Sequence, residues 1–320
     1  LKTLQDLFLG ALNQTHFTGQ PASLYEPVQY IMHLGGKRIR PVLALISCDL
    51  FGADPRTALP AAMAVEIFHN FSLVHDDIMD DAPLRRGQPT VHEKYSANTA
   101  ILSGDVMLVN AYQALEVVQD LQQKSDLFRV FSQVAVEVCE GQQMDMDFEK
   151  RETVAISEYV KMIELKTAAL LAGSLQMGAI LAGASPTEVH TVGQVGRNIG
   201  IAFQLQDDYL DTFGDPASFG KKVGGDIVQN KKTYLFLKAM EIADEVQRQE
   251  LRTCYFGYQG QEEEKISKVK DIFESLGIQS DSKAMMQSYR NEAISHLERL
   301  QSTRNELLLE LIEQLMVREV

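Results

Sequence analysis

Long apolar segments with a helical repeat dominate this chain and leave little of it for a sheet. The runs 159–182 and 286–318 are too long, and too rich in Ala, Leu, Met and Glu, to be strands. No alternating segment bounded by hairpin turns is visible. Near the start, apolar residues recur at helical spacing, as Leu1, Leu4, Leu7, Phe8, Ala11 and Leu12. The sequence therefore predicts an all-α fold of ten or more helices.

Helix starts and loops can also be placed. Asp54-Pro55 has the form of an N-cap followed by Pro at the first helical position, and Ser185-Pro186-Thr187-Glu188 has the form of a capping box. We expect loops at 18–23, 82–90, 123–126, 183–187, 214–225 and 256–263. Because no shift in composition marks a boundary, we expect a single domain over residues 1–320.

Charge and cysteine content narrow the function. The 320 residues carry a formal net charge of −14, which argues against a broad nucleic-acid surface and requires a local basic patch for any anionic substrate. The three cysteines have neither metal-type nor paired spacing, which favours a reducing, cytoplasmic compartment. No apolar run of about 18 residues is apparent, so we expect no membrane span.

One acidic motif occurs twice. Residues 76–80 read DDIMD and residues 207–211 read DDYLD. One D-D-x-x-D arises by chance in roughly one chain in fifteen of this length, and two copies in roughly one in four hundred. On a helix the three Asp of each motif share a face, and both motifs come late in a helix, where the dipole adds partial negative charge. A cation is therefore expected at each motif, and carboxylate oxygens suit Mg²⁺ or Ca²⁺.

Basic residues on Gly-containing segments follow the acidic motifs. The segments are LGGKRIRP at 34–41, LRRG at 84–87 and FGKKVGGDIVQNKKT at 219–233, and a single Lys166 lies in ELKTAAL. Lys and Arg of this kind bind diphosphate groups, and Mg²⁺ is usually completed by substrate phosphates. The residues themselves therefore lead to the hypothesis of a diphosphate held between Mg²⁺ ions and basic side chains.

In these segments the chain resembles the trans-isoprenyl diphosphate synthases of the polyprenyl synthetase family. The matching stretches run in order as GGKRIRP, HNFSLVHDDIMDDAPLRRG, SGDVML, EGQQMD, LKTAALL, GIAFQLQDDYLD, FGKKVGGDI and NKKT, over roughly residues 30–235. The resemblance implies a single large antiparallel helix bundle around a deep central cavity, usually a homodimer. It also implies head-to-tail joining of isopentenyl diphosphate to an allylic diphosphate, with three Mg²⁺.

The resemblance also implies roles for individual residues. The metal ligands would be Asp76, Asp77, Asp80, Asp207, Asp208 and Asp211. The allylic diphosphate would be held by Arg85, Lys166, Lys221 and Lys231, and isopentenyl diphosphate by Lys37, Arg40, His69 and Arg86. Thr167 and Gln204 would place oxygens near the allylic cation. Lys231 is preferred to Lys232 because the family pattern is K-x-T and Thr233 follows. His75 is interpreted as structural or as a neighbour of the metal ligands.

Product length is expected to depend on the residues just before the first motif. Phe71 and Ser72 precede Asp76 by five and four residues, about 6–7.5 Å along a helix axis. A Phe there can act as a floor, whereas the small Ser leaves space. The resemblance implies that bulk at the farther position alone stops the product at fifteen or twenty carbons, so a C15–C20 product is favoured over long-chain quinone tails. A terpene cyclase and a non-catalytic subunit of a heteromeric synthase are less favoured, because both acidic motifs and GGKRIRP are present.

Overall fold

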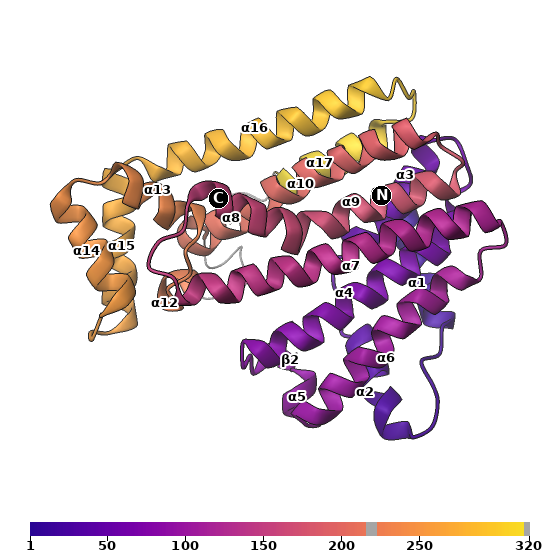
Figure 1. Cartoon of the computed structure of the whole chain (residues 1–320), viewed down its shortest axis with the longest axis horizontal. Coiled ribbons are helices and arrows are strands. Elements are labelled where there is room, and N and C mark those ends of the chain that lie inside the picture. Colours follow the sequence, from indigo (N-terminus) through magenta and orange to yellow (C-terminus); the bar gives the residue numbers. More distant parts are fainter. Residues whose placement is uncertain (216–222, 317–320) are drawn as a thin grey trace. The chain divides into compact units, whose positions relative to one another are not determined.

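The computed structural model describes residues 1–215 and 223–316. Helices make up nearly all regular structure in these ranges, and two strands of two residues each form the remainder (Figure 1). The all-α prediction is confirmed. By their contacts the residues group into two compact units, so the expectation of one domain stays a prediction. Unit 1 comprises Leu1–Gln133, Gly173–Gly193 and Leu300–Leu308, and unit 2 comprises Val134–Ala172, Gln194–Arg299 and Leu309–Val320.

Unit 1 carries the N-terminal helices. They are α1 (Lys2–Gln14), α2 (Ala22–Met32), α3 (Ile39–Leu50), η1 (Pro55–Ala58), α4 (Leu59–Met79), α5 (Val91–Lys94) and α6 (Ala97–Glu116). A small antiparallel hairpin, β1 (Leu84–Arg85) and β2 (Gln88–Pro89), follows α4. The helices α4 and α6 pack along each other. Gly104 of α6 allows this, because a Cβ there would collide with the ring of His75 on α4.

Unit 2 carries the C-terminal helices. They are α8 (Ile156–Ile163), η2 (Glu164–Ala168), α12 (Gly225–Val228), α13 (Tyr234–Ile242), α14 (Glu245–Phe256), α15 (Glu262–Ser275) and α16 (Ile278–Arg299). Four helices contribute residues to both units: α7 (Leu121–Lys150), α9 (Ala169–Leu181), α10 (Pro186–Phe213) and α17 (Glu306–Met316).

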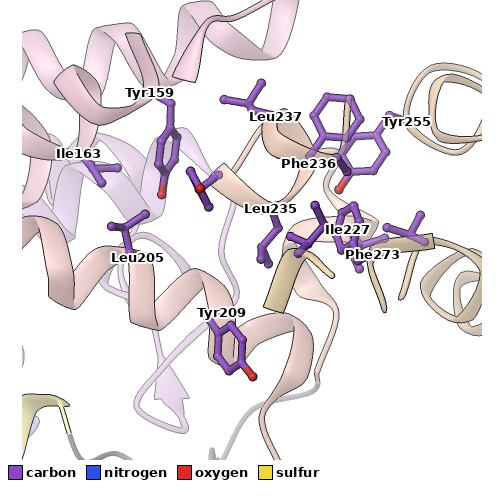
Figure 2. Close-up of a cluster of buried hydrophobic side chains, with 14 of the residues drawn as sticks. Tyr159, Ile163, Leu205, Tyr209, Ile227, Leu235, Phe236, Leu237, Tyr255 and Phe273 are labelled. Atoms are coloured by element: carbon purple, nitrogen blue, oxygen red, sulfur yellow. The ribbon is translucent and has the colours of Figure 1, made fainter. Parts of the chain in front are cut away.

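Aromatic side chains fill the core of unit 2 (Figure 2). Phe236 of α13 stacks on Tyr255 of α14 with 3.9 Å between ring centroids, and Phe273 of α15 is 1 % exposed. Tyr159 of α8 and Tyr209 of α10 are equally buried. Burial of each such ring stabilises the fold by about 1.5–3 kcal/mol, so these residues hold α10, the helix of the second acidic motif, against its neighbours.

Both predicted helix starts are confirmed, whereas most of the loop predicted at 214–225 lies outside the described residues. Asp54 accepts the backbone N–H of Arg56 at 2.9 Å at the start of η1, and Ser185 and Glu188 form the reciprocal bonds of a capping box at α10. The loop predicted at 123–126 is wrong, because these residues lie in the first turns of α7. Asp120 accepts the N–H of Gln123 at 2.8 Å and caps that helix, so its polar residues are simply a solvent-facing helix start.

Two irregular features were not predicted. The hairpin of β1 and β2 was missed because its turn residues, Arg86 and Gly87, have φ of 53° and 73°, and Arg is an unusual residue for such a turn. The run 159–182 is helical throughout but changes at η2, a π-helical turn, which is often found at functional positions.

One helical segment, Pro55–Met79, has the length and apolar composition of a membrane span, although none was expected from the sequence. About 61 % of its most apolar window is buried within the protein. A core helix passes the same test, so the segment is weak evidence for a membrane location.

Candidate active site

The first acidic motif occupies the last turn of α4. The backbone N–H of Asp80 still donates to the carbonyl of Asp76 at 2.9 Å, so these two carboxylates lie one turn apart on the same face. Asp76 is half-buried and Asp80 is exposed. Asp77 differs, because its side chain is only 1 % exposed. The motif therefore divides into two outer carboxylates near the surface and one buried carboxylate between them.

Arg85 neutralises the buried Asp77. Its Nε lies 2.8 and 2.9 Å from the two carboxylate oxygens, and its Nη2 lies 2.6 Å from one of them. Burial acts to lower the pKa of Arg85, but the bond to Asp77 and the charges of Asp76 and Asp80 outweigh it and raise that pKa. This two-pronged ion pair ties the end of α4 to strand β1 and fixes where the guanidinium of Arg85 lies.

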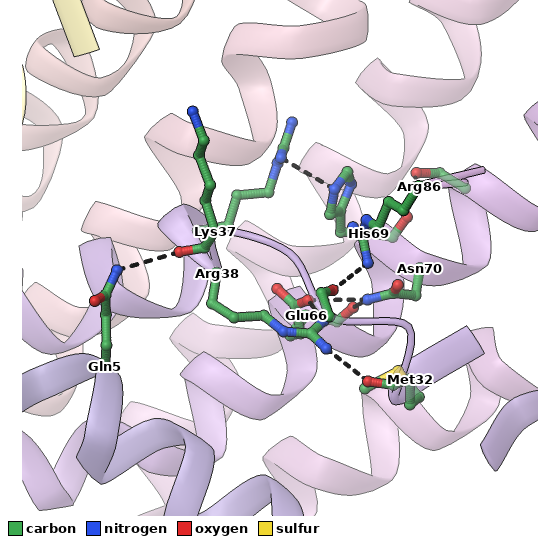
Figure 3. Close-up of polar contacts among 11 residues, drawn as sticks. Gln5, Met32, Lys37, Arg38, Glu66, His69, Asn70 and Arg86 are labelled. Carbon is green, nitrogen blue, oxygen red and sulfur yellow. Dashed lines mark hydrogen bonds and ion pairs between the residues drawn. The ribbon is translucent and has the colours of Figure 1, made fainter. Parts of the chain in front are cut away.

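A second group of cations surrounds the loop before α3 (Figure 3). Arg86 donates to the carbonyl of Gly35, and a Cβ on Gly36 would meet the guanidinium of Arg86 at 2.9 Å. Arg40 lies 3.1 Å from Nε2 of His69. Burial, and then the charge of Arg40, holds the pKa of His69 well below its usual value, so this imidazole is neutral and accepts the bond. Lys37 extends from the same loop.

Arg38 is a supporting residue that sequence reasoning could not separate from its neighbours. It is 6 % exposed, pairs with the buried Glu66 and donates to the carbonyl of Met32 at 2.6 Å. Asn70 also donates to Glu66 at 3.0 Å. Arg38 has φ of 51°, a left-handed conformation that this pairing stabilises. It shapes the loop of Lys37 at the start of α3, the helix that carries Arg40.

The second acidic motif lies in the last turns of α10 and repeats the division seen in the first. Asp207 and Asp211 are half-buried, whereas Asp208 is buried. Gln204 donates to Asp208 at 2.9 Å, and the hydroxyl of Tyr159 donates to its other oxygen. Burial, and then the charge of Asp226, raises the pKa of Asp208 to about 8. The carboxylate of Asp211 accepts the backbone N–H of Asp226 at 2.9 Å.

Thr167 and Lys166 both project from the π-helical turn η2. The hydroxyl of Thr167 donates to Oε1 of Gln204 at 2.9 Å, which joins it to Asp208 and Tyr159 in one network. Lys166 donates to Asp145 at 2.5 Å. Asp145 closes the EGQQMD stretch, to which sequence reasoning gave no role. The structure makes it the anchor of Lys166.

The two adjacent lysines at 231 and 232 have different surroundings. Lys232 is buried and donates to the carbonyls of Phe148 and Glu149, in the last turn of α7, at 2.8 and 3.3 Å. Lys231 is more exposed, with its Nζ 3.9 Å from Asp226. The preference for Lys231 as the ligand-binding residue stays a prediction. Lys221 lies outside the described residues.

The two residues assigned to product length lie on α4. Phe71 is 8 % exposed, with ring centroids 5.4 Å from Phe68 and 4.8 Å from His75. Ser72 is half-buried and donates to the carbonyl of His69 at 2.9 Å. His75 contacts the carbonyl of Ile101 at 3.1 Å, which places it as a structural link between α4 and α6.

The donor set of the outer carboxylates fits Mg²⁺. Each motif offers two carboxylates one helical turn apart, and Mg²⁺ is typically bound by one or two carboxylates, with water and phosphate completing the shell. The middle carboxylates fit such a role less well, because Asp77 already accepts from Arg85, and Asp208 from Tyr159 and Gln204.

Comparison with known proteins defines the class. The sequence profile of the polyprenyl synthetase family matches residues 21–276. The chain is 40 % identical over 284 residues to a short chain isoprenyl diphosphate synthase of Methanothermobacter thermautotrophicus, with 88 % of this chain and 86 % of the relative covered. It is 37 % identical over 292 residues to a geranylgeranyl diphosphate synthase of Sulfolobus acidocaldarius, covering 90 % and 88 %.

A solved structure agrees with these relatives. The crystal structure of a geranylgeranyl pyrophosphate synthase superposes with a TM-score of 0.95 at 46 % identity, over 100 % of this chain and 99 % of that one. The fold is therefore that of the all-α isoprenyl diphosphate synthases. The chain belongs to the polyprenyl synthetase family, as the resemblance predicted.

Gly141 tests the packing that places Lys166. A Cβ on Gly141 of α7 would lie 2.7 Å from Cα of Lys166 and 2.8 Å from the carbonyl carbon of Leu165, so Gly141→Ala must displace η2. We expect a loss of about 1–3 kcal/mol in the free energy of unfolding, measured by urea titration. Gly10→Ala is the matched control, because open space surrounds Gly10 on α1 and Ala favours the helix. Equal stability of the two variants would contradict the packing.

Proposed function

We propose that the chain catalyses Mg²⁺-dependent, head-to-tail condensation of isopentenyl diphosphate with an allylic diphosphate to give a C15–C20 trans-prenyl diphosphate. The observation that carries the proposal is the repeated motif, in which a buried middle carboxylate is held by protein groups while the outer carboxylates stay accessible. The names of the relatives and of the solved neighbour support the same chemistry.

Two sets of cations would hold two diphosphates. Lys37, Arg40 and Arg86, with the neutral His69 among them, form the set in unit 1 that we assign to isopentenyl diphosphate. Arg85, Lys166, Lys221 and Lys231 are assigned to the allylic diphosphate. The ion pair of Arg85 with Asp77 leaves its remaining N–H groups in a fixed direction, which suits recognition of an anion.

The chain's own residues stabilise the charges that develop during the reaction. Asp76, Asp80, Asp207 and Asp211 would hold about three Mg²⁺, which would neutralise the departing diphosphate. As the C1–O bond of the allylic substrate breaks, its electron pair leaves with the diphosphate. The double bond of isopentenyl diphosphate then attacks C1. The isopentenyl unit afterwards loses a proton, which passes to the released diphosphate. Arg85 and Lys166 stabilise the leaving anion as charge accumulates on it.

Thr167 and Gln204 would act on the other charge, the allylic cation. Their oxygens carry partial negative charge, and the network that ends at Asp208 and Tyr159 holds the amide of Gln204 in one orientation. An orientation fixed before the reaction needs no reorganisation as the cation forms. Asp208 and Tyr159 are therefore positioning residues in this proposal.

A homodimer is part of the proposal. Four large apolar side chains are exposed here: Ile101, Leu102 and Val109 of α6, and Val117 directly after its last residue. They fall on one side of the helix by their spacing, and such a strip suits a second copy of the chain. A cytoplasmic location is proposed from cysteine content alone, since Cys48, Cys139 and Cys254 are all free thiols.

The reaction can be tested with purified protein. Incubation with Mg²⁺, isopentenyl diphosphate and C5, C10 or C15 allylic diphosphates should yield prenyl diphosphates of up to 20 carbons, sized by chromatography. Asp76→Asn should lower the rate at least about 100-fold, because it removes a charge that acts in the transition state. Asp6→Asn, on the exposed face of α1, is the matched control and should keep the full rate. Absence of any condensation by the unaltered chain would refute the proposal.

Phe71 is predicted to limit the product. Phe71→Ala removes a ring that lies beside Phe68 and His75, and so opens space one to two turns below Asp76. We expect products longer than those of the unaltered chain by at least one five-carbon unit. Phe8→Ala removes a completely buried ring from α1 and should lower stability without changing product length. Unchanged length in Phe71→Ala would exclude this residue as the floor.

A further inference from the structure

Three potential metal ligands gather beside the hairpin, apart from the two D-D-x-x-D motifs. One ligand atom each from Asp81, His92 and Glu93 lies within 4.8 Å of the other two. Nε2 of His92 is 3.7 Å from a carboxylate oxygen of Glu93. Two ligands about 2.1 Å from a tetrahedral ion would lie about 3.4 Å apart, so only small side-chain shifts separate this group from a metal site.

The backbone builds this group from both ends of the hairpin. Asp81 follows α4 with φ of 49°, and His92 and Glu93 lie on α5 after the hairpin. Thr90 joins the two ends, because its hydroxyl donates to the carbonyl of Ala82 at 2.8 Å and its N–H donates to that of Pro83 at 3.1 Å. Thr90 is completely buried, so the approach of Asp81 to α5 belongs to the packed structure of unit 1.

His92 supplies an independent indication of a ligand. Its side chain is only 8 % exposed, and both Nδ1 and Nε2 are buried without a hydrogen-bond partner in the described residues. Leaving a buried polar group unsatisfied costs about 1–3 kcal/mol. A cation bound at one ring nitrogen would satisfy it, and the exposed carboxylates of Asp81 and Glu93 would balance the charge.

We propose that Asp81, His92 and Glu93 form a zinc site. An imidazole with two carboxylates suits Zn²⁺, whereas Mg²⁺ favours oxygen ligands alone, so this site is chemically distinct from the acidic motifs. Three protein ligands leave a fourth position for water. The proposal does not depend on the proposed function.

Zinc at this position would stabilise the hairpin of β1 and β2. It would cross-link the turn at Asp81 to α5, adding a second connection to the one that Thr90 makes. The segment between these points carries Arg85 and Arg86. Zinc would therefore stabilise unit 1 and reduce the motion of that hairpin, without entering the condensation chemistry.

The test uses the full chain, stripped of metal and dialysed against Zn²⁺ in millimolar Mg²⁺, so that Mg²⁺ competes at the carboxylate motifs. Atomic absorption should count one Zn²⁺ per chain, and its addition should raise the thermal midpoint. His92→Ala and Glu93→Gln should each weaken zinc binding more than about tenfold. Glu93 is exposed, so its variant keeps the fold. His190→Ala, at an exposed position of α10, should bind as the unaltered chain does.

Two outcomes would overturn the zinc site. One is no zinc retained by the unaltered chain in the presence of Mg²⁺. The other is full retention by both His92→Ala and Glu93→Gln. The condensation rate with Mg²⁺ alone would stay unchanged in either case, so failure here is distinguishable from failure of the proposed function.

Discussion

The ion pair between Asp77 and Arg85 is the interaction on which the organisation of the first motif depends. A carboxylate that is 1 % exposed must be neutralised, and removal of one partner from a buried pair typically costs about 3–5 kcal/mol. The pair fixes the hairpin to the end of α4. The hairpin turn then aims Arg86 at the carbonyl of Gly35, which lies in the loop of Lys37. One buried charge thus orders the two arginines of the hairpin, Arg85 and Arg86.

In unit 2 the buried middle carboxylate of the motif is held by neutral hydrogen-bond donors. Among the described residues, Asp208 accepts from the hydroxyl of Tyr159 and from the amide of Gln204. Burial, and then the charge of Asp226, raises the pKa of Asp208 to about 8. The partners are held in turn by Thr167 and by the aromatic core around Tyr159. In both motifs the middle carboxylate therefore orients neighbouring groups, and we propose that the outer ones bind metal.

The sequence predicted the fold class and the family, because helical periodicity and the paired motifs are local patterns. It could not predict which carboxylate of each motif is buried, since Asp76 and Asp77 have the same chemistry and differ only in what packs on them. It also could not predict that Arg38 binds the carbonyl of Met32 whereas Arg40 lies beside His69. The pairing of Asp145 with Lys166 was not predictable either, because the two residues are far apart in sequence. The loop wrongly placed at 123–126 shows that a polar helix start and a loop have similar composition.

The division of each motif into metal-binding and positioning carboxylates is tested most directly by counting bound metal. Mn²⁺ in place of Mg²⁺ can be counted by electron paramagnetic resonance, with inorganic diphosphate present. Asp76→Asn and Asp207→Asn should each lower the number of Mn²⁺ bound per chain. Asp77→Asn, with its fold verified by circular dichroism, should keep the metal but bind diphosphate more weakly, because Arg85 loses its anchor. Equal loss of metal in Asp76→Asn and Asp77→Asn would contradict this division.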